Sequence, residues 1–235
     1  MLHNALRLGL RCSVLTALAL AGASASATPP TAAACEPRSV LRDADTVRSV
    51  AEFVAASGMS MLSFVGYSGA GYEDEAAMLA QADAELARFD PGRTIVNIGA
   101  TAQGIGAVYA LARQRGFFTL GIVSSLARDA GDGLSPCVDA VFFVRDTVWG
   151  GRLPGQTGLS PTSAAMVNNS LVIIGIGGGE VARDELLAAR AAAKSVRFIA
   201  ADMNHRIARD KARAKGQPEP SDFRGAAHAA FAIRP

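Results

Sequence analysis

The sequence predicts an α/β domain, a doubly wound and mostly parallel Rossmann-like sheet with helices on both faces. Six short apolar segments have the pattern of strands that are buried on both sides. Most of them are separated by segments whose apolar residues recur at helical spacing. Such alternation indicates parallel strands joined by crossover helices.

The first half of the domain alternates helix and strand. A helix follows the candidate cap Asp45 and ends at Gly58, with apolar residues at helical spacing: Val47, Val50, Ala51 and Val54. A strand over 61–66 precedes a helix over 73–89, whose acidic first turn suits the positive end of the helix dipole. We expect its buried stripe to be Met78, Ala82, Leu86 and Phe89. The turn at Pro91-Gly92 leads to a strand over 94–98.

The second half continues the alternation. A helix over 105–115 can be capped by Gly116. Strands over 117–123 and 138–144 follow, then a short helix opened by Ser160-Pro161 and a strand over 171–176. A helix over 181–193 and a strand over 196–200 complete the sheet. Ligands of such sheets bind beyond the C-terminal ends of the strands, where the strand order reverses.

The N-terminus has the pattern of an export signal. Arg7 and Arg11 supply positive charge, residues 12–23 form an uncharged apolar run, and residues 25–27 are small enough for signal peptidase. The apolar run is too short to cross a bilayer. We therefore expect an exported protein, periplasmic or secreted, with no membrane segment after cleavage. A misassigned start codon, and hence a cytoplasmic protein, is the alternative.

The chain divides into four predicted regions. These are a signal peptide (1–27), a Pro- and Ala-containing linker (28–38), the Rossmann-like domain (39–204), and a C-terminal helix and tail (205–235). Cleavage of the signal leaves Cys35 and Cys137, whose pairing would close a loop of about a hundred residues. Two unrelated thiols are the alternative, and the sequence leaves both open.

Composition argues against nucleic acid as a partner. The chain has 23 Lys and Arg against 21 Asp and Glu, a formal net charge of +2. That excess is too small for a broad basic surface. Arg206, Arg209, Lys211, Arg213 and Lys215 form a local basic stretch, which favours a solvated helix face over a phosphate clamp. His205 and His228 have no metal-ligand spacing, so no metal site is predicted.

Three of the predicted strands are followed by glycine-rich loops. Glycine lets the backbone approach a ligand closely, and the free N–H groups of the next helix suit a phosphate. The alternative is that the glycines only permit tight turns. The residues that we expect to bind ligand are Gly66, Ser68 and Gly69 in the first loop, Gly99, Thr101, Gly104 and Gly106 in the second, and Gly177, Gly178 and Gly179 in the third.

The second loop, GATAQGIG, also approaches the TGxxxGIG fingerprint of short-chain dehydrogenases, but its first gap is one residue too long. Those enzymes need a Tyr-x-x-x-Lys pair. The chain has three tyrosines, and none has a lysine four residues later. The proton-transfer group of that family is therefore missing.

Residues 60–202 resemble the SLOG superfamily, which includes the Lonely Guy phosphoribohydrolases. The resemblance rests on the segments FVGYSGAGYEDEAAMLAQADAEL and IVNIGATAQGIGAVYALARQRGFFTLGIV. It also rests on residues 177–185, which stand where the family has PGGxGTxxE and put Glu185 on the motif glutamate. The resemblance implies a nucleotide-like ligand and self-association, as a homodimer.

The chain departs from the family pattern at functional positions. Gly177, Val181 and Ala182 replace the motif's proline, third glycine and threonine. The active enzymes carry an arginine about 23 residues before the glutamate, where this chain has Thr162. Arg152 lies ten residues out of register.

We therefore predict a domain that binds a nucleotide or a nucleotide-derived small molecule without turnover, with Thr162 among its ligand contacts and with no cofactor. The alternative is a nucleoside 5′-monophosphate phosphoribohydrolase with Glu185 as catalytic carboxylate. Splitting an N-glycosidic bond needs such a carboxylate and a positive group, and nothing in register supplies the second. Glu185 also fits a solvated helical residue.

Overall fold

The computed structural model describes residues 35–36, 39–44, 47–130 and 133–231. The predicted signal peptide, residues 28–34 and 37–38 of the predicted linker, and the candidate cap Asp45 lie outside these ranges. Among the described residues, no helix is both long and apolar enough to cross a membrane.

Seven parallel strands form one sheet in the order β1-β5-β4-β3-β2-β6-β7, which confirms the predicted α/β, Rossmann-like class. The strands are β1 (Val40–Ala44), β2 (Ser60–Gly66), β3 (Thr94–Ile98), β4 (Phe118–Ser124), β5 (Ala140–Val144), β6 (Val172–Ile176) and β7 (Ser195–Ile199). The six predicted strands correspond to β2 through β7.

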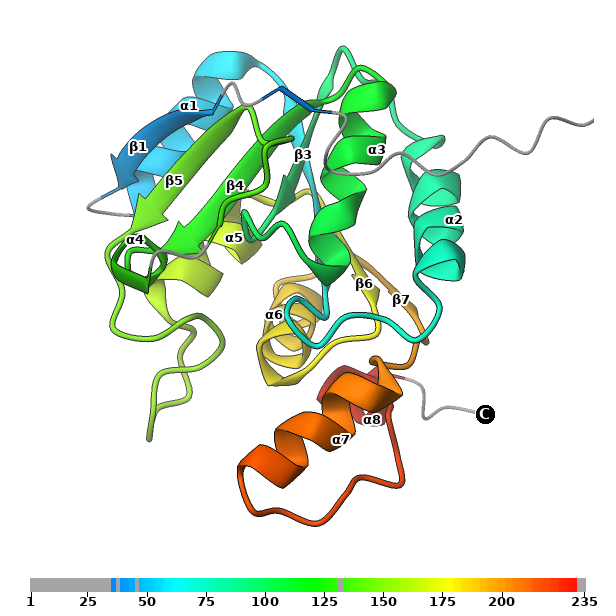
Figure 1. Ribbon diagram of the computed structural model, residues 1–235. Coiled ribbons are helices and arrows are strands. Elements are labelled where there is room, and N and C mark those ends of the chain that lie inside the picture. Colours follow the sequence, from blue (N-terminus) through cyan, green and yellow to red (C-terminus); the bar gives the residue numbers. More distant parts are fainter. Residues whose placement is uncertain (1–34, 37–38, 45–46, 131–132, 232–235) are drawn as a thin grey trace, which may run out of the picture.

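Helices cover both faces of the sheet (Figure 1). Helices α2 and α3 pack on one face, while α1, α5 and α6 pack on the other. The helices are α1 (Val47–Ser57), α2 (Glu75–Leu86), α3 (Val108–Gln114), α4 (Leu126–Ala130), α5 (Pro161–Asn169), α6 (Glu180–Ala191), α7 (His205–Ala214) and α8 (Ala226–Phe231), with a 3-10 turn η2 (Gly104–Ala107).

Alternation along β2 shows how the two layers are made. Leu62 and Phe64 pack in the core beneath α2 and α3, whereas Met61 and Val65 face the opposite layer. Since successive side chains of a strand point to opposite faces, a central strand covered on both sides is apolar on both. This is why the apolar segments of the sequence located the strands correctly.

Helix α2 begins later than the sequence predicted. The Asp74 carboxylate accepts a hydrogen bond from the Ala77 N–H at 2.8 Å, so Asp74 is the N-cap and Glu73 precedes the helix. Glu73 instead accepts a hydrogen bond from the His205 N–H at 2.9 Å. Asp74, which was predicted to lie in the first turn of the helix, is therefore its N-cap.

Strand β1 was not predicted, because it is an exposed edge strand that carries Arg42 and Asp43. It pairs with β5 in parallel, from Val40 opposite Ala140 to Ala44 opposite Val144. Val40 and Leu41 are 53% and 56% exposed, so little burial holds this strand to the sheet.

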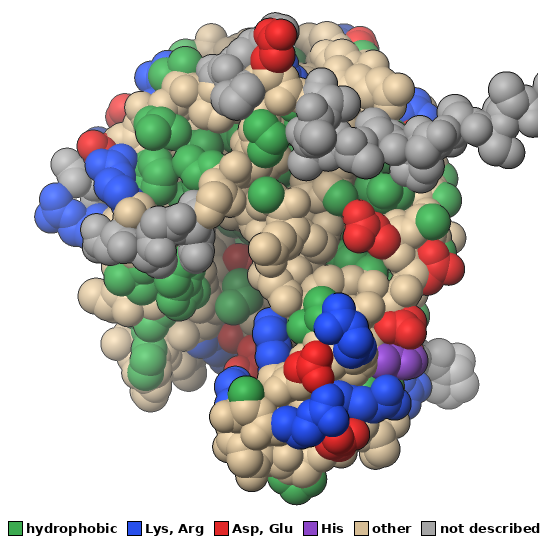
Figure 2. Space-filling view, in the orientation of Figure 1, with side chains coloured by type: hydrophobic (Ala, Val, Ile, Leu, Met, Phe, Trp, Pro, Cys, Tyr) green, Lys and Arg blue, Asp and Glu red, His purple; other side chains and the backbone are tan. Residues whose placement is uncertain are grey.

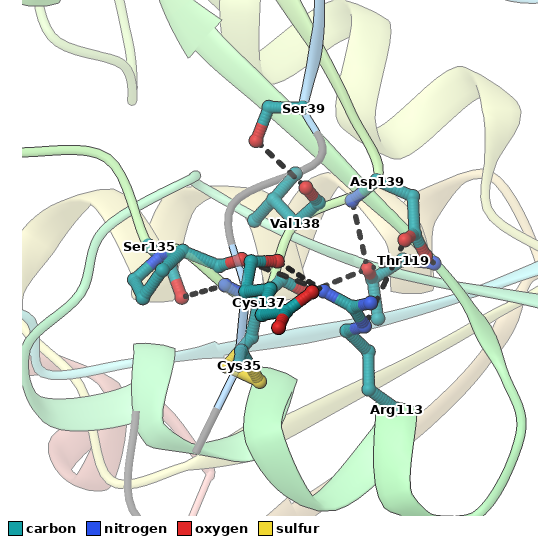
Figure 3. Close-up of a disulfide and its surroundings, with 10 residues drawn as sticks. Cys35, Ser39, Arg113, Thr119, Ser135, Cys137, Val138 and Asp139 are labelled. Carbon is teal, nitrogen blue, oxygen red and sulfur yellow. Dashed lines mark hydrogen bonds and ion pairs between the residues drawn. A yellow bond between two sulfur atoms is a disulfide. The ribbon is translucent and has the colours of Figure 1, made fainter. Parts of the chain in front are cut away.

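A disulfide between Cys35 and Cys137 joins the segment before β1 to the segment before β5 (Figure 3). The two cysteines are 102 residues apart, and their Cα atoms lie 5.1 Å from each other. Beside it, the Ser39 hydroxyl donates to the Val138 carbonyl at 2.7 Å. The covalent link therefore stands at the point where β1 joins the sheet, and it supports an edge strand that buries little apolar surface.

The C-terminal segment, predicted as one helix and a tail, forms the two helices α7 and α8. Helix α8 packs against α6 and β7, with Ala227 fully buried and the Phe231 ring tilted against the Phe198 ring at a centroid distance of 5.6 Å. Helix α7 lies beyond the C-terminal ends of β6 and β7, as Figure 1 shows. The segment therefore lies over the sheet edge where the ligand site was predicted.

Candidate functional site

The strand order reverses between β2 and β6. The chain passes from β2 through β3 and β4 to β5, and then crosses to β6 on the other side of β2. A cavity of about 520 Å³ opens at the C-terminal edge of β2, β3 and β4 and is also lined by α5 and α6. This volume lies within the range of about 300–1,000 Å³ that is usual for small-molecule sites.

The walls of this cavity are of mixed character, with apolar side chains forming somewhat more of the surface than polar groups. They include Phe64, Ile98 and Ile122 at strand ends, Met166 from α5, and Trp149, which is 53% exposed. Figure 2 shows the hollow in this face of the molecule, with hydrophobic side chains on its wall. The sequence did not assign Phe64, Ile98 or Ile122 to the site, because a residue at a strand end has the same pattern as a core residue.

Seven of the predicted site residues line the cavity. They are Gly66, Ser68 and Gly69 from the first loop, Gly99 and Thr101 from the second, Thr162 from α5, and Glu185 from α6. Gly104, Gly106, Gly177, Gly178 and Gly179 are not in its lining. The structure thus brings the first two glycine loops together at the cavity with α5 and α6.

Gly104 and Gly106 are needed for close contact between backbones. Gly104 has φ +58°, and a Cβ there would lie 2.2 Å from the Tyr67 carbonyl oxygen. A Cβ on Gly106 would lie 2.0 Å from the Thr101 carbonyl oxygen. The Ile105 N–H donates to the Tyr67 carbonyl at 2.7 Å. Gly104 therefore allows the second loop to contact the first, while Gly106 allows the second loop to fold against its own Thr101.

The third glycine loop is covered by the protein itself. A Cβ on Gly177 would lie 2.5 Å from the Tyr67 ring, and one on Gly178 would lie 2.5 Å from the Ala182 Cβ. The Gly178 carbonyl accepts a hydrogen bond from the Ala227 N–H at 3.1 Å. We expected three glycine loops to line the site, but only the first two line the cavity. The third loop leads into α6, and residues of that helix line the cavity instead.

The hydroxyl groups of all three tyrosines of the chain form hydrogen bonds with backbone groups near the cavity. The Tyr67 hydroxyl accepts from the Gly225 N–H at 2.6 Å, and the Tyr72 hydroxyl donates to the Ile176 carbonyl at 2.7 Å. The Tyr109 hydroxyl accepts from the N–H groups of Ile98 and Ala100 at 3.0 and 3.2 Å. Burial raises the pKa of each phenol, so each stays a neutral hydroxyl at physiological pH.

Replacing Tyr109 with phenylalanine is expected to loosen the end of β3. The variant leaves the Ile98 and Ala100 amides without their acceptor inside a fully buried site. We expect a loss of about 2 to 3 kcal/mol in the free energy of unfolding, measured by denaturant titration. Hydrogen exchange should accelerate at these two amides and not in β5. Unchanged exchange there would contradict the assigned role.

Among the residues that the structure describes, Glu185 is the single ionisable side chain in the lining of the cavity. It is 4% exposed, and its Oε1 accepts a hydrogen bond from the Ser163 hydroxyl at 2.6 Å. Burial raises its pKa to about 7, a shift that the Ser163 hydrogen bond opposes and the neighbouring Asp184 charge supports. Near neutral pH the carboxyl can therefore accept a hydrogen bond or, when protonated, donate one.

The two arginines that most closely precede Glu185 in the sequence are bound to Asp184. The Arg183 guanidinium lies 2.9 Å from the Asp184 carboxylate, and the Arg152 Nε lies 3.7 Å from it. Neither arginine lines the cavity, whereas Thr162 does, as its register with Glu185 predicts. In the part of the chain that the structure describes, no Lys or Arg belongs to the lining, so this wall offers no cation to a phosphate.

No group of three or more His, Cys, Asp or Glu side chains that could hold a metal ion occurs among the described residues.

The parallel sheet defines a Rossmann-like domain, and its cavity lies at the reversal point where small-molecule sites of such sheets occur. No protein-family model and no curated protein matches the sequence.

Solved structures with a similar fold include the structural genomics target TM1055, with 19% identity and a TM-score of 0.42 over 59% of this chain and 72% of that one. Two others are of the molybdenum cofactor carrier protein from Chlamydomonas reinhardtii. One has 18% identity and a TM-score of 0.42 over 60% of this chain and 76% of that one. The other has 17% identity and a TM-score of 0.43 over 73% of this chain and 94% of that one. Similarity at this level says nothing about the ligand of this protein.

Proposed function

We propose that the protein binds a nucleotide or a nucleotide-derived small molecule in the cavity between the first two glycine loops and helices α5 and α6, and that it does so without turnover. The observation that carries the proposal is the cavity itself, about 520 Å³ of space at the reversal point of the sheet, with both apolar side chains and polar groups in its lining. A planar base suits the apolar part of the lining.

Polar groups in the lining of the cavity support a ligand of mixed character. The loop residues Ser68, Gly69 and Thr101 offer backbone and hydroxyl groups, and Glu185 offers a carboxyl group at the wall formed by α6. A carboxylate accepts hydrogen bonds from amino and ring N–H groups of a base. Resemblance to the SLOG superfamily in residues 60–202 favours the same ligand class.

The absence of turnover is proposed because the cavity lining, among the described residues, contains a carboxyl group without a basic partner. Cleavage of an N-glycosidic bond needs both a group that stabilises the oxocarbenium ion and one that assists the leaving group or holds the phosphate. Thr162 stands where the active enzymes carry arginine and cannot supply a positive charge.

The chain has a single tryptophan, Trp149, which lines the cavity and therefore reports on its occupancy. We expect nucleoside 5′-monophosphates to change its fluorescence and to raise the melting temperature, because a ligand that binds only the folded state stabilises it. If no nucleotide or nucleoside changes either signal, the proposal is wrong.

Filling the cavity should remove binding. A Cβ at Gly99 has no atom within 4 Å, and Gly99 lines the cavity, so Gly99→Leu places a side chain in the ligand space without distorting the backbone. We expect at least about a tenfold weaker affinity by Trp149 fluorescence, equivalent to about 1.4 kcal/mol or more.

The matched control for this variant is Gly158→Leu. Gly158 also has no neighbour within 4 Å of a Cβ, but it lies outside the cavity lining. It should bind as the wild type does. Equal affinity of Gly99→Leu and wild type would exclude this cavity as the binding site.

A phosphoribohydrolase remains the second candidate, favoured by the position of Glu185 in the cavity wall and by its pKa of about 7. The two functions are separated by incubating the protein with nucleoside 5′-monophosphates and measuring free base. Release that disappears in Glu185→Gln would replace the binding proposal with a hydrolytic one.

We also propose that the protein works outside the cytoplasm. The Cys35–Cys137 disulfide supports this, because such bonds persist mainly in oxidising compartments. N-terminal sequencing of the protein from its host tests it, since export predicts a chain that begins near residue 28. The homodimer implied by the family resemblance is proposed on that ground alone, and light scattering measures it.

A further inference from the structure

A lysine from the C-terminal segment lies at the edge of the cavity. The Lys211 ammonium on α7 donates a hydrogen bond to the Gly69 carbonyl at 2.9 Å, across 142 residues of sequence. Gly69 lines the cavity, as does Gln103, whose amide oxygen lies on the same side of Gly69 as the Lys211 Nζ. In the space-filling view, basic side chains of this segment border the hollow (Figure 2).

Lys211 differs from the arginines of α7 in its electrostatic partners. Arg206 lies 3.4 Å from Asp210, and Arg209 and Arg213 lie 3.8 and 3.4 Å from Glu219. The contact found for Lys211 among the described residues is the neutral Gly69 carbonyl. Its charge is therefore not balanced by a carboxylate and remains available to an anion.

Backbone hydrogen bonds connect the end of the first glycine loop to the start of α7. The Asn204 side chain caps α7 by accepting from the Ile207 N–H at 3.0 Å. The Asn204 N–H donates to the Gly71 carbonyl at 3.3 Å, and Met203 pairs with Tyr72. These contacts set the direction of α7, so that Lys211, almost two turns into the helix, reaches back to Gly69.

We infer that Lys211 supplies the positive contact for the anionic group of the ligand, the role that no residue in the family register fills. The inference rests on the proposed function and specifies the ligand as one with a phosphate or similar anion directed to the mouth of the cavity. Its base or other apolar part then lies against the inner walls. A lysine suits this role, because its ammonium group can donate to the phosphate while it keeps its hydrogen bond to Gly69.

The test compares AMP with adenosine in wild type and Lys211→Met, using Trp149 fluorescence at low ionic strength. We expect the substitution to weaken AMP binding about tenfold, as for loss of one charge-assisted contact, and to change adenosine binding less than about twofold. Lys211→Arg should keep most of the AMP affinity. The control is Lys215→Met, an exposed lysine at the C-cap of the same helix, which should behave as wild type. An unchanged AMP-to-adenosine preference in Lys211→Met overturns the inference.

Inorganic pyrophosphate separates this inference from the proposed function, because it needs no base-binding wall. We expect it to raise the melting temperature of the wild type and to have a smaller effect on Lys211→Met. If pyrophosphate shows this dependence while AMP and adenosine do not bind, the nucleotide proposal fails and the role of Lys211 stands. If adenosine binds but neither anion depends on Lys211, the cavity proposal stands and the role of Lys211 is excluded.

Discussion

Loss of the Cys35–Cys137 disulfide is expected to lower the free energy of unfolding by about 4 to 5 kcal/mol. The bond closes a loop over a sequence separation of 102 residues, so its removal restores much conformational freedom to the unfolded chain. The corresponding fall in melting temperature is about 10 to 15 °C for a domain of this size. The variant to measure is Cys35→Ala/Cys137→Ala, by denaturant titration under oxidising conditions.

The structure also predicts which strand loses the most stability when the disulfide is removed. Since β1 is an exposed edge strand held next to the disulfide, hydrogen exchange in β1 should rise more than in β3, at the centre of the sheet. Dithiothreitol should destabilise the wild type and leave the double variant unchanged. A double variant as stable as the oxidised wild type would show that the bond does not support the fold.

Replacing Glu185 with glutamine is expected to stabilise the protein at pH 8 by up to about 3 kcal/mol. The pKa of the folded state is raised from 4.5 to about 7 by burial. Between these two values the unfolded chain releases a proton that the folded chain retains, so stability falls as the pH rises and levels off above about pH 7. Glutamine can still accept the Ser163 hydrogen bond and carries no charge.

Comparison of the two proteins at pH 5 and pH 8 isolates this effect. The gain should be small at pH 5, where the folded carboxyl is protonated, and largest at pH 8. Glu180→Gln is the matched control, because Glu180 lies in the first turn of the same helix with its side chain 82% exposed. A gain in Glu185→Gln that does not vary with pH would show that the carboxyl does not ionise with a raised pKa.

The strands that the sequence located are those whose burial is visible in local composition. β3 is buried along its whole length, and its predicted and observed bounds agree. β1 was not predicted because it is exposed at four of five positions and contains two charged residues. Its place in the sheet depends on pairing with β5 and on the disulfide nearby, and both involve residues about a hundred positions away.

Some features of the candidate site were likewise predicted from the sequence, and others were not. The first two glycine loops were predicted from residue type and position, since the ends of parallel strands meet at one edge, whereas Glu185 and Thr162 were assigned through the family resemblance. The covering of Gly178 by Ala227 and the approach of Lys211 to Gly69 could not be predicted in either way. Both depend on the path of the C-terminal segment after β7.

Local pattern was thus enough for the α/β class, six of the seven strands and the edge at which a ligand site should form. Each follows from burial, helical spacing and the direction of parallel strands, which adjacent residues encode. The partner of each cysteine, the closure of the third glycine loop and the cation at the cavity mouth required the folded chain. These features join residues distant in sequence, and their geometry depends on packing that no short segment contains.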